Sequence, residues 1–213
     1  DFMESLLTEL DKCGLNFSQV SLSRLLNLLD QESLELQELA VLILAKTNRP
    51  AVDFPPQLIQ SLLDSEHEKL RVSGVRLLGQ FSDAELTERY ELILDLVGAK
   101  TAEIRKLIYP VIFRVTGQDT QFSQKIFDDL IARLIRARLS KDALEEMTDY
   151  LLHGHRYQLK CLDTAVIIKL LRVNGAAANR LGESLLEKLS VATCGREDIL
   201  ELASHELVKV RLL

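Results

Sequence analysis

The stretch HGHRY, with His153 and His155, is the part of the sequence that comes closest to a metal site. Two histidines at i and i+2 can hold a metal ion when a strand brings them to one face, and further ligands must complete the coordination. The pattern around this stretch predicts a turn, and no Asp, Glu or Cys stands at ligand spacing from the pair. We therefore expect no metal here.

No other combination of residues indicates catalysis. The sequence contains no G-x-S-x-G turn, Walker loop, dinucleotide-binding glycine motif or H-E-x-x-H pair. The glycines of NGAAANRLG, residues 174–182, lack the spacing of a phosphate-binding loop, and no carboxylate is singled out as an acid with a raised pKa. We expect a protein that is not an enzyme and needs no cofactor.

Composition favours a packed helical protein. Of 213 residues, 47% are hydrophobic but only 5% aromatic, and there are 9 Gly and 4 Pro. Three widely spaced cysteines favour buried, reduced thiols over a disulfide framework. No apolar run approaches the roughly 20 residues of a membrane span, and no segment has the form of a secretory signal. We expect a cytoplasmic protein, and the ends of the chain, Asp1 and VKVRLL, lead us to expect a fragment of a longer one.

An apolar pattern recurs every 34 residues. LLDQESLELQELAVLILA begins at Leu28, LLDSEHEKLRVSGVRLLG at Leu62 and LVGAKTAEIRKLIYPVIF at Leu96. In each, apolar or small residues recur at i, i+3, i+4, i+7 and i+8, which is the buried face of an amphipathic helix. A preceding helix keeps the same register four times, and the fourth unit then needs a short insertion near Arg138. Each unit therefore predicts two antiparallel helices joined by a tight turn.

The expected fold class is all-α, a right-handed α-solenoid of about five to six antiparallel helix pairs. A single repeat domain would span 1–213, with units at approximately 16–49, 50–83, 84–117, 118–154 and 155–192 and flanking helices in 1–15 and 193–213. Individual helices are predicted near 2–13, 18–30, 33–47, 55–64, 67–81, 83–97, 101–116, 120–137, 140–153, 156–173, 176–191 and 196–212.

Gly74 lies in the middle of the buried stripe of the predicted helix 67–81, and Ala40 stands at the same register position one unit earlier. A position that faces the partner helix closely must be small, and this requirement outweighs the lower helix propensity of glycine. Ile108 occupies the position in the next unit, where we expect looser or shifted packing.

The chain resembles the HEAT-repeat family of armadillo-like α-solenoids. The resemblance is carried by Asp64, the turn and the step Leu70-Arg71, and by Ile104-Arg105 without the Asp. It covers about residues 16–175 and is strongest over 16–117. It implies binding of proteins, or sometimes of nucleic acid, along a curved surface lined by second helices, and it implies no chemistry.

In the HEAT family, the Asp and Arg of these motifs tend to form a ladder between neighbouring repeats. Gln37 stands opposite Asp30 in the first unit of this chain, and Gly98 stands opposite Arg105 in the third. The resemblance therefore implies a complete Asp–Arg motif only in the middle unit.

Charge is unevenly distributed along the chain. Residues 1–99 carry a net charge of −9, residues 100–141 of +5 and residues 142–213 of −2, so that the whole chain is at −6. The basic band consists of Lys100, Arg105, Lys106, Arg114, Lys125, Arg133, Arg136, Arg138 and Lys141. It suits either an acidic partner or a phosphate backbone, or it is an ordinary solvated face.

An apolar row at 34-residue spacing, Val41, Val75 and Tyr109, lies beside the core stripe. This row either forms an apolar strip for a partner helix or peptide, or packs against the adjacent repeat. The candidate partner-binding residues, drawn from this row and from cations on the second helices and in the basic band, are Arg71, Val75, Arg76, Arg105, Lys106, Tyr109, Arg133, Arg136 and Arg138.

Two functional hypotheses follow. The first is a non-enzymatic scaffold that binds a protein or peptide partner, possibly acidic, or other domains of the same longer chain, on its concave second-helix surface. The second is a nucleic-acid-binding HEAT-like protein, similar to alkylpurine DNA glycosylases, that uses the basic band at residues 100–141. A pI of about 5.3 and the lack of Trp count against the second.

Overall fold

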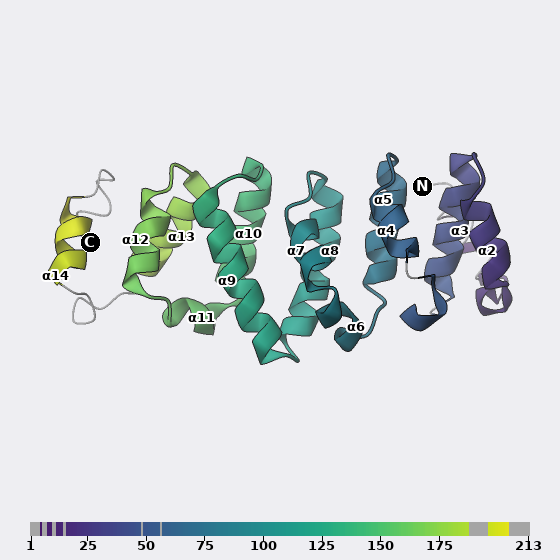
Figure 1. Cartoon of the computed structure of the whole chain (residues 1–213), viewed down its shortest axis with the longest axis horizontal. Coiled ribbons are helices and arrows are strands. Elements are labelled where there is room, and N and C mark those ends of the chain that lie inside the picture. Colours follow the sequence, from purple (N-terminus) through teal and green to yellow (C-terminus); the bar gives the residue numbers. More distant parts are fainter. Residues whose placement is uncertain are drawn as a thin grey trace. The chain divides into compact units, whose positions relative to one another are not determined.

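The computed structural model describes residues 5, 8–9, 12–14, 16–47, 49–55, 57–187 and 196–204. Every regular element within these residues is a helix, and none of them is a strand (Figure 1). The predicted all-α class is confirmed. The chain divides into two compact units, of which unit 1 comprises Asp1–Leu96 and Glu103–Val115, and unit 2 comprises Val97–Ala102 and Thr116–Leu213.

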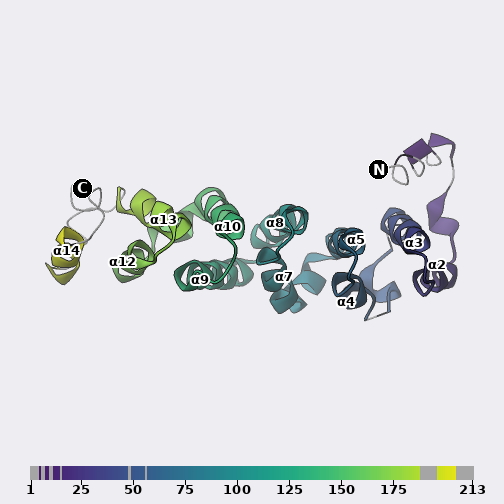
Figure 2. The same ribbon diagram turned by 90° about the horizontal axis from the view of Figure 1, so that it is seen from above.

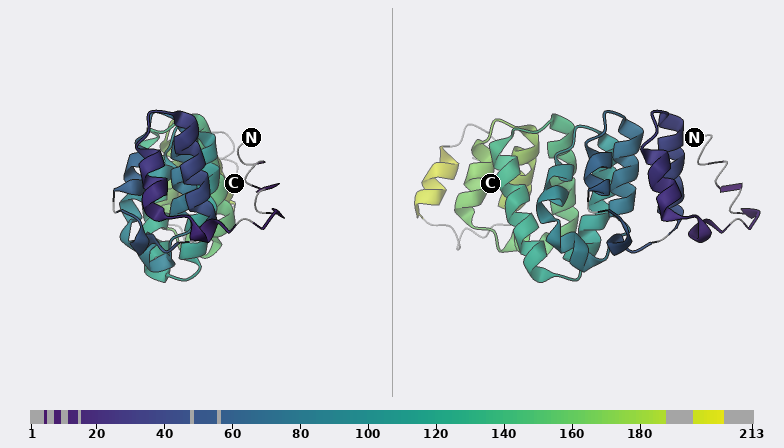
Figure 3. Two further views of the ribbon diagram at one scale, coloured as in Figure 1. Left: turned by 90° about the vertical axis from the view of Figure 1, so that its right-hand side faces the viewer. Right: turned by 45° about the vertical axis from the view of Figure 1, so that its right-hand side comes forward.

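Unit 1 is built from helices that pack in pairs. Its elements in chain order are η1 (Phe17–Gln19), α2 (Leu22–Leu29), α3 (Leu34–Lys46), η2 (Ala51–Asp53), α4 (Leu58–Leu63), α5 (Glu68–Leu78), α6 (Asp83–Glu88), α7 (Tyr90–Val97) and α8 (Ala102–Thr116). Helix α2 packs against α3, α4 against α5, and α3 against α5 (Figure 3). The view from above shows α3, α5 and α8 in one row and α2, α4 and α7 in the other (Figure 2).

Unit 2 repeats the paired arrangement with longer helices. Its elements are α9 (Thr120–Arg136), α10 (Lys141–Gly154), α11 (Arg156–Lys160), α12 (Thr164–Arg172), α13 (Ala176–Leu186) and α14 (Arg196–Ala203). Helix α9 packs against α10, α12 against α13, and α10 against α13. Each of the five predicted repeat units thus contains one helix pair, namely α2/α3, α4/α5, α7/α8, α9/α10 and α12/α13.

Helix starts follow from local capping chemistry. Ser33, Asp119, Ser140 and Asp163 each accept a hydrogen bond from a backbone N–H of the first turn that follows. Such side chains satisfy N–H groups that have no partner inside the helix. Because these polar residues recur between apolar stripes, the sequence pattern located most helices to within a few residues.

Two predicted helices are each divided in the structure. The predicted helix 83–97 becomes α6 and α7, because Arg89 adopts a non-helical conformation with φ −100° and ψ 30°. The predicted helix 156–173 becomes α11 and α12, because the Asp163 side chain caps a new helix at Ala165 N. The predicted helix 2–13 falls largely outside the described residues, as does the end of the predicted helix 196–212.

Close helix packing explains the small residue in the stripe of α5. A Cβ atom added at Gly74 would lie 3.0 Å from Leu62 Cβ and 3.3 Å from Leu63 Cδ2, both on α4. A Cβ at Gly182 of α13 would lie 2.9 Å from Leu171 Cδ2 on α12. The prediction for Gly74 is confirmed, and unit 2 uses the same device.

Two cysteines depart from the expectation of burial. Cys13 and Cys161 are exposed free thiols, while Cys194 lies outside the described residues. Among the helices described, none combines the length and apolar character that crossing a bilayer requires.

Candidate interaction surface

Ion pairs join consecutive helix pairs at one constant sequence separation. Within the described chain, Lys69 Nζ lies 3.1 Å from Glu38 Oε2, Arg114 Nε lies 2.9 Å from Asp83 Oδ1, and Arg180 Nη2 lies 2.7 Å from Asp149 Oδ1. In each case the acid precedes the cation by 31 residues. With a repeat of 34 residues, this separation places the acid about one helical turn beyond the residue equivalent to the cation in the preceding repeat.

Hydrogen bonds to backbone carbonyls repeat in a similar way. Gln80 Nε2 donates to Ala45 O at 2.6 Å, Arg114 Nη1 to Gly79 O at 2.9 Å, and Arg180 Nη2 to Glu145 O at 3.2 Å. Each donor follows its acceptor by 35 residues. Constant offsets of this kind are expected when neighbouring helix pairs stack in the same manner, since every pair then meets its predecessor at equivalent positions.

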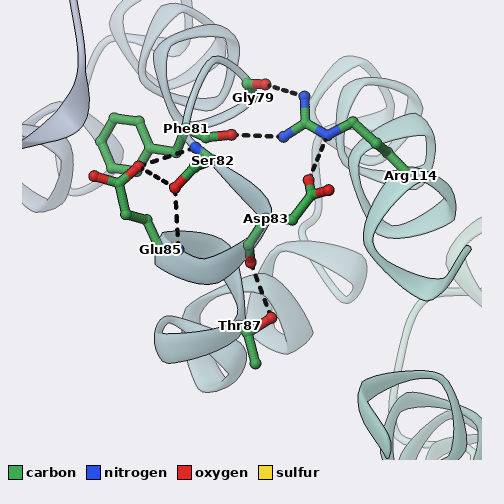
Figure 4. A network of polar contacts seen from close by, with 7 residues as sticks. All are labelled: Gly79, Phe81, Ser82, Asp83, Glu85, Thr87 and Arg114. Atoms are coloured by element: carbon green, nitrogen blue, oxygen red, sulfur yellow. Dashed lines mark hydrogen bonds and ion pairs between the residues drawn. The ribbon is translucent and has the colours of Figure 1, made fainter. Parts of the chain in front are cut away.

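Arg114 makes the densest of these contacts (Figure 4). Its guanidinium donates to Asp83 Oδ1, to Gly79 O at 2.9 Å and to Phe81 O at 2.6 Å. Ser82 and Glu85 form a reciprocal capping box at the start of α6 beside it. One side chain of α8 thereby holds the whole turn between α5 and α6.

Side chains that open the second helices hold the turn before them. Gln37 Nε2 donates to Gln31 O at 2.6 Å, and Arg71 Nη1 donates to Ser65 O at 2.7 Å. The two donors and the two acceptors are each separated by 34 residues. Asp64 accepts hydrogen bonds from Gln60 rather than from an arginine. The Asp64–Arg71 motif implied by the HEAT resemblance therefore forms no ion pair among the described residues.

A groove of about 450 Å³ opens on the second helices of unit 1. Its lining comes from α3 (Glu38, Leu42), from α5 (Glu68, Lys69, Val72, Ser73, Arg76) and from the first turn of α8 (Glu103). Glu38 is only 7% exposed, and its carboxylate pairs with the exposed Lys69. The groove therefore has charged walls over a partly apolar floor.

The structure buries part of the predicted contact set in unit 1. Val41 is fully buried, and Val75 and Arg105 are each 1% exposed, so none of them offers its side chain to a partner. The alternative interpretation, packing inside the unit, fits the two valines. Tyr109 is half-buried, and Arg71 is half-buried and held by turn carbonyls. Within this unit, Arg76 and Lys106 are the exposed members of the set, and both lie on second helices.

The basic band does not form one continuous feature. Arg105, Lys106 and Arg114 belong to unit 1, and the other members belong to unit 2. Arg105 is buried and Arg114 is occupied by its turn, so neither offers a phosphate-binding group. In unit 2, Arg136 and Arg138 are exposed near the end of α9, and Arg133 is half-buried.

The two histidines of HGHRY have different surroundings. His153 is exposed, and its Nδ1 lies 2.6 Å from Asp149 O. His155 is 1% exposed, its Nε2 lies 3.2 Å from Tyr150 Oη, and its ring packs against Phe127. Burial lowers the pKa of His155, and burial raises the pKa of Tyr150 to about 12 against the opposing effect of a hydrogen bond with Thr116. Three potential metal ligands gather nowhere in the part of the chain that is described.

The repeating ion pairs were missed by sequence reasoning, although the sequence contains a signal for them. Opposite charges occur at a separation of 31 residues in Glu38 and Lys69, in Asp83 and Arg114, and in Asp149 and Arg180. A search for charge pairs near the repeat length would have found all three. The groove could not be found in this way, because it depends on which side chains the packing leaves exposed.

Comparison with known proteins adds no family to this description. No protein-family model matches the chain, and no curated protein matches it either. The HEAT resemblance therefore continues to depend on the repeat and on the contacts between helix pairs.

Proposed function

We propose that the chain is a non-enzymatic scaffold of HEAT-like helix pairs, stacked as a right-handed α-solenoid, that binds a partner protein along its second helices. The constant separations of 31 and 35 residues support equivalent stacking of successive pairs. Such stacking lines one side of the molecule with second helices, which is the concave side in solenoids of this kind.

The groove on α3 and α5 is the observation that carries this proposal. It lies on second helices, at the point where two consecutive pairs meet. Leu42 and Val72 supply apolar contact, and exposed charges surround them. An apolar centre with a polar rim is the usual anatomy of a protein interface. Arg76 of α5 and Lys106 of α8 extend the surface toward the next second helix.

Nucleic acid is the less favoured partner. Binding to a phosphate backbone needs several accessible cations along one face. Arg105 is buried, Arg114 binds the α5–α6 turn, and the groove itself contains Glu38, Glu68 and Glu103. Carboxylates at that position would repel phosphate groups.

Site-specific photo-crosslinking tests the proposal. A photoreactive amino acid is placed at Arg76 or Lys106 on the second helices, and at Arg24 of α2 as a matched exposed cation on a first helix. Crosslinking is carried out in cell extract, and the products are identified by mass spectrometry. We expect the same protein to be captured from both second-helix positions and not from position 24.

Charge reversal provides the second arm. Arg76→Glu and Lys106→Glu should each weaken binding of the captured protein, whereas Arg24→Glu should not. Equal capture from all three positions would overturn the proposed surface. Products that disappear after nuclease treatment, together with salt-dependent binding of a DNA duplex, would favour the nucleic-acid hypothesis instead.

A further inference from the structure

Unit 2 contains a cavity of about 750 Å³ where α10, α11, α12 and α13 come together. Apolar side chains form its floor: Leu152 from α10, Leu159 from α11, Leu162 from the following turn, Ile167 from α12 and Leu185 from α13. A cavity of this size lies within the range of ligand-binding sites, which are mostly apolar with a few polar groups.

Three cationic or titratable side chains accompany this apolar floor. His153, Arg156 and Lys160 line the same cavity, and all three are exposed. Arg156 and Lys160 stand at i and i+4, which places them on the same face of α11. Neither of them forms a hydrogen bond or an ion pair with a described residue. Cations gathered in this way repel one another unless an anion lies between them.

Acidic residues nearby are already occupied. Asp149 accepts from Arg180 at 2.7 Å, and Asp163 accepts from Ala165 N at 2.9 Å as the cap of α12. The described lining includes no carboxylate. The cavity therefore has an unneutralised positive side and an apolar side.

We propose that this cavity binds an acidic segment of a partner protein in which a bulky apolar residue adjoins Asp or Glu. The apolar side chain enters the leucine-lined floor, and the carboxylate faces Arg156 and Lys160. Leu159, Ile167 and Leu185 are all buried, so the floor exposes enough apolar surface for one or two side chains rather than for a long alkyl chain. Tyr157, which is 78% exposed on α11, adds an aromatic residue of the kind that interfaces favour.

Peptide binding to the full chain tests this proposal directly, and it does not depend on the second-helix groove. The probe is a fluorescein-labelled peptide of Phe, Leu, Glu and Asp, followed by fluorescence anisotropy. One control peptide replaces the acids with Lys, and the other replaces Phe and Leu with Ser. We expect saturable binding of the acidic–apolar probe and at least about tenfold weaker binding of both controls, since loss of one such contact costs about 1.4 kcal/mol.

Variants locate the binding site. Lys160→Glu should weaken binding of the probe about tenfold or more, whereas Lys169→Glu, an equally exposed lysine at the end of α12, should leave it unchanged. Ser184→Trp should block binding by filling the cavity, with the circular dichroism spectrum showing that the helices are retained.

Three results would overturn the proposal. They are no binding of the probe at low salt, equal binding of all three peptides, and equal losses in Lys160→Glu and Lys169→Glu. Displacement of the probe by decanoate as effectively as by unlabelled peptide would assign the cavity to a lipid carboxylate instead, and would also overturn it.

Discussion

Arg114 of α8 lies 31 residues after Asp83 and pairs with its carboxylate at 2.9 Å, while the same guanidinium donates to the carbonyls of Gly79 and Phe81. Both charged side chains are partly exposed, at 43% for Arg114 and 39% for Asp83. The ion pair is therefore screened by water, and the two carbonyl contacts carry the greater part of the stabilisation.

Replacement of the two partners should have unequal effects. Arg114→Met removes three acceptor contacts, so we expect a loss of about 1–2 kcal/mol in the free energy of unfolding. Asp83→Asn weakens only the exposed pair, and we expect less than about 1 kcal/mol. Urea unfolding followed by circular dichroism measures both, with Arg24→Met on α2 as a surface control. Equal losses in the two variants would show that the ion pair dominates.

Gly74 is expected to resist even the smallest side chain. Gly74→Ala gains helix propensity of up to about 1 kcal/mol, yet its Cβ would lie 3.0 Å from Leu62 Cβ, an atom fixed to the backbone of α4. Overpacking of this kind costs about 1–3 kcal/mol, so we expect net destabilisation. Gly79→Ala is the matched control, since its Cβ would meet only Val111 Cγ2, at 3.3 Å. A Gly74→Ala protein as stable as the wild type in urea would contradict this close approach.

Periodicity in the sequence predicted the helices because it reflects burial. Leu25 and Ile59, which share one register position, are both buried, and so are Ala40, Gly74 and Ile108 at another. The 34-residue repeat therefore located the helix pairs correctly. It failed where one local interaction divided a continuous apolar stripe, as the cap at Asp163 and the non-helical Arg89 do.

The candidate surface was less predictable than the helices. Val75 and Arg105 stand at positions that periodicity assigns to the edge of the buried stripe, and a rotation of a few tens of degrees decides whether they are exposed. The structure buries both of them. Arg76 and Lys106, one position further along, are exposed. Helical spacing alone therefore could not separate these neighbours.

The capping box of α6 should contribute measurably to the stability of unit 1. Ser82 Oγ accepts from Glu85 N, and Ser82 N and Oγ donate to Glu85 Oε2. Ser82→Ala should cost about 1 kcal/mol in the free energy of unfolding, whereas Ser82→Asp, which retains a capping oxygen, should cost less. Thermal or urea unfolding distinguishes the two variants. An alanine variant with wild-type stability would mean that the Arg114 contacts alone fix this turn.

His155 should make the stability of unit 2 depend on pH. Burial lowers its pKa below the ordinary value of 6.5, so the unfolded chain binds the proton first as the pH falls. The contribution of neutral His155 is fully present above about pH 6.5, and it decreases as the pH falls toward the lowered pKa of the folded state. His155→Gln removes this titration, so its free energy of unfolding should decrease less between pH 7.5 and pH 5.5 than that of the wild type. His153→Gln, at an exposed position two residues away, should keep the wild-type dependence. Urea unfolding at several pH values measures all three proteins, and identical pH profiles for the wild type and His155→Gln would show that the buried imidazole is not the titrating group.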